Sequence, residues 1–169
     1  MSCMDEKFKV RVTVAQWPTR SPVYHKPDGL RFAHPNTLKV RANQKYVVEA
    51  IITPAKTLTG MRIWGQTLFM TPVHERHHRD IARYSAIWCT SGYDVNKNKT
   101  RTFVPVMMEF KGEAVLLATV QCKVYPGDGD GGHYQWGQTL HSIDLDCKAL
   151  TDGAYVDLIS EKFVSSRTL

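Results

Sequence analysis

The stretch FVPVMMEFKGEAVLLATVQCKVY, residues 103–125, decides the fold class. Phe103–Phe110 and Ala114–Tyr125 are apolar runs rich in β-branched residues, which is typical of strands. Lys111-Gly112-Glu113 separates them, and a glycine near the apex allows the backbone angles that a tight turn needs. The stretch therefore predicts a β-hairpin that supplies much of the core.

Further strand patterns lie on both sides of this hairpin. Lys7–Val14 alternates Phe and Val with Lys, Arg and Thr, so one face is apolar and the other cationic. Tyr46–Thr53 and Ile87-Trp88 also indicate strands, and Tyr155–Val164 fits a last strand or a short helix. We expect one β-rich α+β domain covering residues 1–169, built from β-sandwich-like sheets.

One helix and one long loop complete the expected architecture. Thr71-Pro72 fits an N-cap followed by proline at the first helical position, which predicts the main helix near residues 71–84. Residues 18–36 contain four prolines and predict an extended loop. Trp64–Leu68 (WGQTL) recurs as Trp136–Leu140, which indicates either an internal repeat of residues 45–70 and 117–142 or chance similarity between two β segments.

Charge is distributed unevenly along the chain. The net charge is +6, and residues 1–101 hold 17 Lys and Arg against 7 Asp and Glu, while residues 102–169 hold 5 against 9. A basic and an acidic surface would favour an anionic partner, or docking between copies of the chain through Asp144 and Asp146. Alternatively, strands from the two halves pair with each other and the asymmetry disappears in space.

The string His74-Glu75-Arg76-His77-His78 matches the spacing with which two histidines on a helix bind zinc beside a general base. The intervening residues are charged, where a zinc helix needs an apolar buried side. Asp128-Gly129-Asp130-Gly131 resembles the start of a calcium loop, but Thr139 stands where the bidentate Glu would be needed. We therefore expect no metal, no cofactor and no enzymatic activity, and keep a zinc hydrolase as a minor alternative.

Three basic clusters are candidate contacts for RNA or an anionic membrane. They are Lys7, Lys9 and Arg11 on the first strand, Arg76, Arg79 and Arg83 on the expected helix, and Lys97, Lys99 and Arg101 in a polar loop. The sequence has neither a secretory signal nor an apolar run of about 20 residues, and its four cysteines form no Cys-x-x-Cys pair. We expect an intracellular protein with reduced thiols, in the cytoplasm or nucleus.

Three segments resemble rhabdovirus matrix proteins in their order. Lys7–Val14 resembles the first core strand of that family, Lys45–Ala50 the second, and Phe110–Leu117 the aromatic-Lys-Gly turn with its following strand. The lysine-rich N-terminal tail and the Pro-Pro-x-Tyr motif of many members are absent, and a small plant-infecting member could lack both.

This resemblance implies a viral structural protein of matrix type, present in the host cell and in the virion. Such a protein would associate with itself in open-ended oligomers, bind the viral nucleocapsid or RNA, and touch an anionic membrane. The alternative is a β-sandwich module that binds carbohydrate or protein, of lectin or coat-protein-like jelly-roll type, with Trp64 or Trp136 as a sugar platform.

Overall fold

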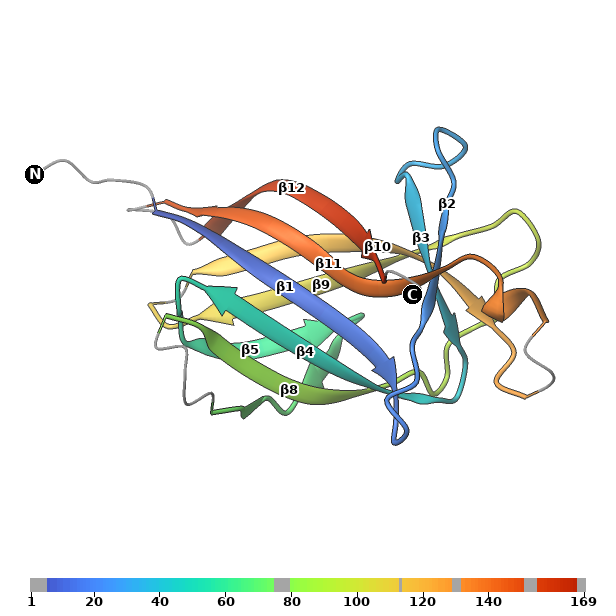
Figure 1. Cartoon of the computed structure of the whole chain (residues 1–169), viewed down its shortest axis with the longest axis horizontal. Coiled ribbons are helices and arrows are strands. Elements are labelled where there is room, and N and C mark those ends of the chain that lie inside the picture. The colour runs from blue at the N-terminus through green and yellow to red at the C-terminus, as the bar shows by residue number, and fades with distance from the viewer. Residues whose placement is uncertain (1–5, 75–79, 113, 129–131, 151–154, 167–169) are drawn as a thin grey trace, which may run out of the picture.

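The computed structural model describes residues 6–74, 80–112, 114–128, 132–150 and 155–166 (Figure 1). Almost all of its regular structure is β-strand. The elements are β1 (Glu6–Gln16), β2 (Tyr24–Pro27), β3 (Asn36–Arg41), β4 (Lys45–Thr53), β5 (Leu58–Ile63), β6 (Gln66–Leu68), β7 (Thr71–Pro72), β8 (Ala82–Cys89), β9 (Thr102–Phe110), β10 (Val115–Tyr125), the 3-10 helix η1 (Gly132–Gln135), β11 (Gln138–Ala149) and β12 (Tyr155–Ser165).

The predicted hairpin is confirmed as β9 and β10. The two strands are antiparallel, with Met108 opposite Leu116 and Val104 opposite Val120. These four side chains are buried because alternate residues of each strand face the core. Beyond the hairpin, β5 pairs with β9, and the far end of β10 pairs in parallel with β3.

The remaining strands continue the same sheet around the core. Along the path β3-β2-β11-β1-β4-β8-β7 each strand pairs with the next. β12 lies along β11 and also pairs with the start of β10, so it bridges two parts of the sheet (Figure 1). The curled sheet forms a single domain with a closed β-barrel core, which confirms the expected β-rich domain.

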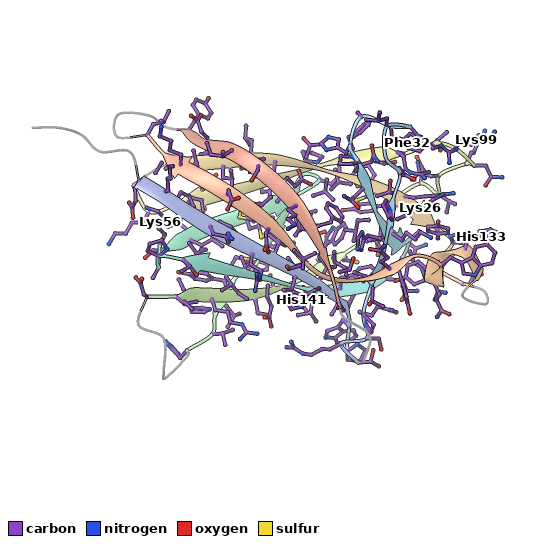
Figure 2. All side chains as sticks on the ribbon, turned by 45° about the horizontal axis from the view of Figure 1, so that its top comes forward. Lys26, Phe32, Lys56, Lys99, His133 and His141 are labelled. Atoms are coloured by element: carbon purple, nitrogen blue, oxygen red, sulfur yellow. The ribbon has the colours of Figure 1, made fainter. Side chains whose placement is uncertain are left out.

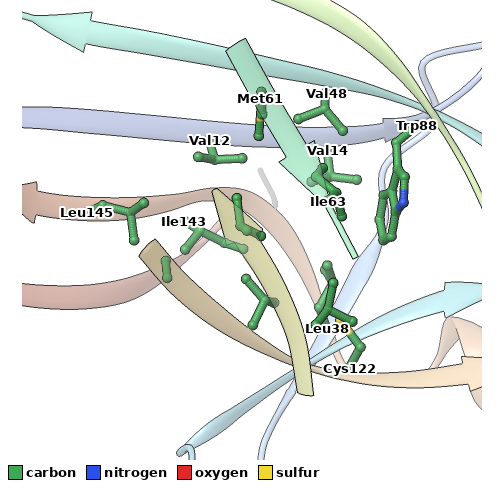
Figure 3. A pocket seen from close by; sticks show the side chains of 14 residues that line it. Val12, Val14, Leu38, Val48, Met61, Ile63, Trp88, Cys122, Ile143 and Leu145 are labelled. Atoms are coloured by element: carbon green, nitrogen blue, oxygen red, sulfur yellow. The ribbon is translucent and has the colours of Figure 1, made fainter. Parts of the chain in front are cut away.

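Side chains from opposite parts of the sheet fill this core. A small apolar cavity of about 40 Å³ remains among them and is lined by Val12, Val48, Met61 and Ile143 (Figure 3), together with Val104. A space this small and apolar has no polar partner for a water molecule. The interior is therefore a packed core rather than a binding site.

The prediction of a main helix near residues 71–84 is wrong. Thr71 and Pro72 form the short strand β7, in which Thr71 lies opposite Ser85 of β8. Ala86 and Trp88 of β8 are buried while Ile87 between them is exposed, which is the alternation of a strand. Pairing with β4 over its whole length satisfies the backbone of β8 and overrides the local N-cap signal.

Two further segments refine the expectation. Tyr155–Ser165 is a strand rather than a helix, and the expected loop at residues 18–36 contains the short strand β2. The long strand β11 was not predicted, although Ile143, Leu145 and Cys147 are buried and alternate with the more exposed Asp144 and Asp146. The period-2 pattern of this strand was therefore present in the sequence but was missed.

Candidate functional site: a cationic pocket at one end of the sheet

The cations of the first strand lie beside the acidic residues expected to mediate self-association. Arg11 lies opposite Asp144, and its Nε and Nη2 donate to the two carboxylate oxygens at 3.0 and 3.1 Å. Lys9 lies opposite Asp146, with Nζ 3.8 Å from Oδ1. Lys7 is exposed at the start of the strand. The two differently charged halves of the sequence therefore pair within this sheet, and neither Arg11 nor Asp144 is a free charge.

Arg83 also has a partner within the chain. It donates to Glu49 through Nε at 2.9 Å and Nη2 at 2.6 Å, and Arg20 donates to the same carboxylate at 3.1 Å. Burial alone would raise the pKa of Glu49, but the hydrogen bonds from Arg83 and Arg20 outweigh it and lower the pKa. The other two members of that predicted cluster, Arg76 and Arg79, lie outside the described residues.

The third basic cluster separates into residues of different kinds. Arg101 is buried, with its Nε 3.3 Å from Oδ2 of the fully buried Asp28 and its guanidinium 4.3 Å from the ring centre of Phe32. It anchors the loop between β2 and β3. Lys99 is exposed, whereas Lys97 lines a pocket.

This pocket has a volume of about 650 Å³ and opens at one end of the sheet. Figure 2 shows Lys26, Phe32, Lys99 and His133 gathered at this end, with Lys56 at the opposite end. Its walls are formed by loop residues 95–98, the ends of β3 and β10, Pro126 and Asp128 after β10, and the helix η1. The lining residues are Arg41, Val95, Asn96, Lys97, Asn98, Lys123, Val124, Tyr125, Pro126, Asp128, Gly132, His133 and Tyr134.

The parallel pairing of β3 and β10 places the charged side chains. Lys39 lies opposite Lys123, and Arg41 lies opposite Tyr125. Their neighbours Leu38, Val40, Cys122 and Val124 are buried in the core. Because side chains alternate between the two faces of a strand, the side chains of Lys39, Arg41, Lys123 and Tyr125 lie on the outer face.

Lys39 joins this outer face to the helix η1. Its Nζ donates to the carbonyl oxygen of His133 at 2.7 Å and to that of Trp136. Burial, and then repulsion from the nearby Lys26, Lys123 and Arg101, lowers the pKa of Lys39 to about 8. This repulsion arises because several positively charged side chains lie near Lys39 on this side of the sheet.

Aromatic rings position the other cations. The guanidinium carbon of Arg41 lies 4.4 Å from the ring centre of Tyr134, and Nζ of Lys123 lies 5.2 Å from that of Tyr125. The two tyrosine rings meet edge to face, with centroids 5.9 Å apart. Cations held over aromatic faces in a concave site can bind an anionic group together with a flat or apolar neighbour.

Sequence reasoning found Lys97 but missed Arg41, Lys123, His133 and Tyr134. The signal available in the sequence was the alternation Cys122-Lys123-Val124-Tyr125 at the end of an apolar run, which places a lysine and a tyrosine on one face. The pairing of β10 with β3 could not be read from the chain, because parallel partners carry no local turn signal.

The structure supplies no metal centre in the part of the chain that it describes. Among those residues, no group of three or more His, Cys, Asp or Glu side chains could hold a metal ion. His74 is exposed, and Glu75, His77 and His78 lie outside the described residues. Within the same residues, no helix is both long enough and apolar enough to cross a membrane.

The cysteine thiols and tryptophans occupy defined places. Cys89, Cys122 and Cys147 are free thiols, and Cys122 is a buried core residue. Trp64 packs on Tyr93 with ring centroids 4.2 Å apart, and the half-exposed Trp136 packs on His133 at 4.0 Å. Trp136 therefore lies beside the pocket, whereas Trp64 is partly buried and packs against the hydrophobic core.

Comparison with known proteins identifies relatives over most of the chain. The family model described as CB1 cannabinoid receptor-interacting protein 1 matches residues 4–163. The curated proteins of that name from Homo sapiens, Bos taurus and Mus musculus are each 27% identical over 142 residues, which cover 82% of this chain and 86% of the relative.

These matches overturn the viral interpretation. The resemblance to rhabdovirus matrix proteins was wrong, since it rested on short strand segments that many β-rich proteins share, while the family match extends through the whole sheet. The comparisons therefore also contradict the matrix-type function and the virion location that the resemblance implied. They equally contradict the nucleocapsid, RNA and membrane partners and the open-ended self-assembly. The lectin, jelly-roll coat-protein and zinc-hydrolase alternatives receive no support from the relatives either. The chain belongs to the CB1 cannabinoid receptor-interacting protein 1 family.

Proposed function

We propose that this protein is a non-enzymatic binding protein whose partner is a cannabinoid receptor of the CB1 type. The observation that carries this proposal is the family match over residues 4–163, because the relatives are named for interaction with that receptor. The aligned region spans most of the length of both proteins, so a shared binding role does not depend on an isolated segment.

The contact face that we assign to this role is the cationic pocket. It is a concave part of the outer surface on which an arginine, two lysines and two tyrosine rings converge, and arginine and tyrosine are enriched in protein interfaces. The apolar cavity inside the sheet is too small to hold a peptide side chain. A partner polypeptide would therefore bind at the end of the sheet rather than enter the core.

Binding to purified receptor tests the proposal. The full chain would be titrated onto CB1 receptor held in nanodiscs, taken from the species of this protein, and binding would be read by biolayer interferometry. We expect saturable binding that is competed by the human relative, since related surfaces would occupy the same receptor segment. Failure of this chain to bind under conditions in which the human relative binds its own receptor would refute the proposal.

Two charge-matched variants assign the contact face. Lys123→Gln removes a cation from the pocket, whereas Lys111→Gln removes one from the turn after β9, where its backbone nitrogen donates to Thr57. We expect only Lys123→Gln to weaken receptor binding. Equal affinity of the two variants would place the contact elsewhere on the molecule.

A further inference from the structure

The pocket carries positive charge that the described residues do not neutralise. Arg41, Lys97 and Lys123 line it, and within the described chain none of the three forms an ion pair. Asp128 is the single acidic residue among the lining residues, which leaves a net charge of two positive units, not counting His133. This contrasts with Arg11, Arg83 and Arg101, whose charges are matched by carboxylates.

The charge is also held in place before any ligand arrives. Lys39 lies behind the pocket, 5.6 Å from the ring centre of Tyr125, and is tied to the carbonyl groups of His133 and Trp136. Arg41 is fixed against Tyr134. Cations that are already oriented lose little conformational entropy on binding, so the pocket is organised in advance for an anion.

We propose that this pocket binds a phosphoryl group carried on a side chain of the protein partner, so that the protein recognises a phosphorylated segment; this rests on the proposed function. A phosphoryl group carries about −1.5 to −2 charges near neutral pH, which matches the net charge of the site. A single carboxylate would leave one of the two positive charges unbalanced.

The composition of the pocket suits this group. Arg41 offers a planar fork of donors, while Lys97 and Lys123 are compact point charges, and this combination is common where proteins hold phosphate. The volume of about 650 Å³ greatly exceeds that of one phosphoryl group. Flanking residues of the peptide would fill the remainder along the Tyr125 and Tyr134 rings.

A peptide titration tests this inference directly. The full chain would be mixed with a degenerate nonapeptide library with fixed central phosphoserine, with the same library carrying serine, and with inorganic phosphate. Binding would be followed by the amide NMR signals of residues 95–98 and 123–125. We expect the phosphoserine library to bind at least about tenfold more tightly than the serine library, since a hydrogen bond to a charged group contributes that much. Inorganic phosphate should bind weakly at the same signals.

Two lysines of one loop provide the matched control. Lys97→Gln removes a cation that lines the pocket, and Lys99→Gln removes an exposed one two residues away that does not. We expect Lys97→Gln to weaken phosphopeptide binding about tenfold and Lys99→Gln to leave it within about twofold. Equal loss in both variants would show only nonspecific attraction, and absence of a preference for phosphoserine would overturn the inference.

Phosphatase treatment separates this inference from the proposed function. If the receptor binds this protein with equal affinity before and after the treatment, the proposed receptor partnership stands and the proposed phosphoryl recognition is wrong. If the phosphoserine library binds through Lys97 but the receptor does not bind in either state, the pocket has the proposed chemistry and the receptor assignment is wrong. Loss of receptor binding after the treatment supports both.

Discussion

Arg11 of β1 and Asp144 of β11 lie directly opposite each other although 133 positions separate them in the sequence, and their side chains form two hydrogen bonds of 3.0 and 3.1 Å. The bidentate geometry is the strong form of an arginine–carboxylate pair. It also joins the basic first half of the chain to its acidic second half. Charges that appear separated along the sequence are therefore neighbours in the sheet.

Replacing Asp144 by Asn should destabilise the fold by roughly 1 kcal/mol, because Arg11 is partly exposed and solvent screens the pair. Burial raises the pKa of Asp144, but hydrogen bonds from Arg11 and Ser142 outweigh it and lower the pKa. The stabilisation is therefore present above the unfolded pKa near 3.9 and is lost as the pH falls through the lower folded value. Urea unfolding of Asp144→Asn at pH 7 and pH 2.5 checks this, with Asp157→Asn on the exposed side of β12 as control. A difference between Asp144→Asn and the native chain that persists unchanged at pH 2.5 would contradict it.

Glu49→Gln should cost more, about 2–4 kcal/mol, because Glu49 is buried and the change weakens hydrogen bonds to two arginines. The exposed Glu109→Gln on β9 is the matched control and should change the free energy of unfolding by less than about 0.5 kcal/mol. Chemical denaturation at pH 7 measures both. Similar values for the two variants would show that the Arg20–Glu49–Arg83 cluster contributes little.

Glu161→Gln should stabilise the protein at alkaline pH. Burial raises the pKa of Glu161 to about 7, so the folded state favours the protonated carboxyl group. The native chain thus loses stability as the pH rises from the unfolded value near 4.3 through the folded value near 7, and a neutral glutamine avoids this loss. We expect a gain of about 1–3 kcal/mol at pH 8.5 and no gain at pH 4. Thermal unfolding across that range measures it, and a constant difference at all pH values would contradict the assignment.

Lys39→Met should loosen one wall of the pocket without unfolding the sheet. The change removes the donor to the carbonyl oxygens of His133 and Trp136, while the aliphatic part of the side chain is kept. Amide hydrogen exchange in residues 132–136 should accelerate by at least about tenfold, whereas exchange in β9 should stay within about twofold. Uniform acceleration throughout the chain would instead indicate global destabilisation.

The sequence predicted strands from long apolar runs or a long apolar alternation. Lys7–Val14, Tyr46–Thr53 and the hairpin of residues 103–125 appear as β1, β4, β9 and β10 because their inward residues are apolar. The helix predicted from Thr71-Pro72 was wrong, since a local N-cap pattern is a weaker constraint than the pairing of β8 with β4. Strand β11 was missed although Ile143, Leu145 and Cys147 alternate with Asp144 and Asp146 in the sequence.

The candidate site depends on partners that lie far apart in the sequence. Lys97 was predicted as a ligand-binding cation and does line the pocket, but Arg101 beside it is buried against Asp28. Whether a cation is free or paired depends on which carboxylate the topology brings near it, and composition cannot supply that information. Arg41 and Lys123 join one site only because β3 and β10 run in parallel.

The position of β11 has a consequence for how the molecule is made. β1 acquires β4 as its first neighbour early in synthesis, but its other edge waits for residues 143–149, which leave the ribosome about a hundred residues after β4. Until then the growing chain presents an open strand edge next to Val10, Val12 and Val14. A ribosome that stalls between β10 and β11 would thus hold a sheet with one unpaired edge, and such a nascent chain is exposed to aggregation until β11 is made.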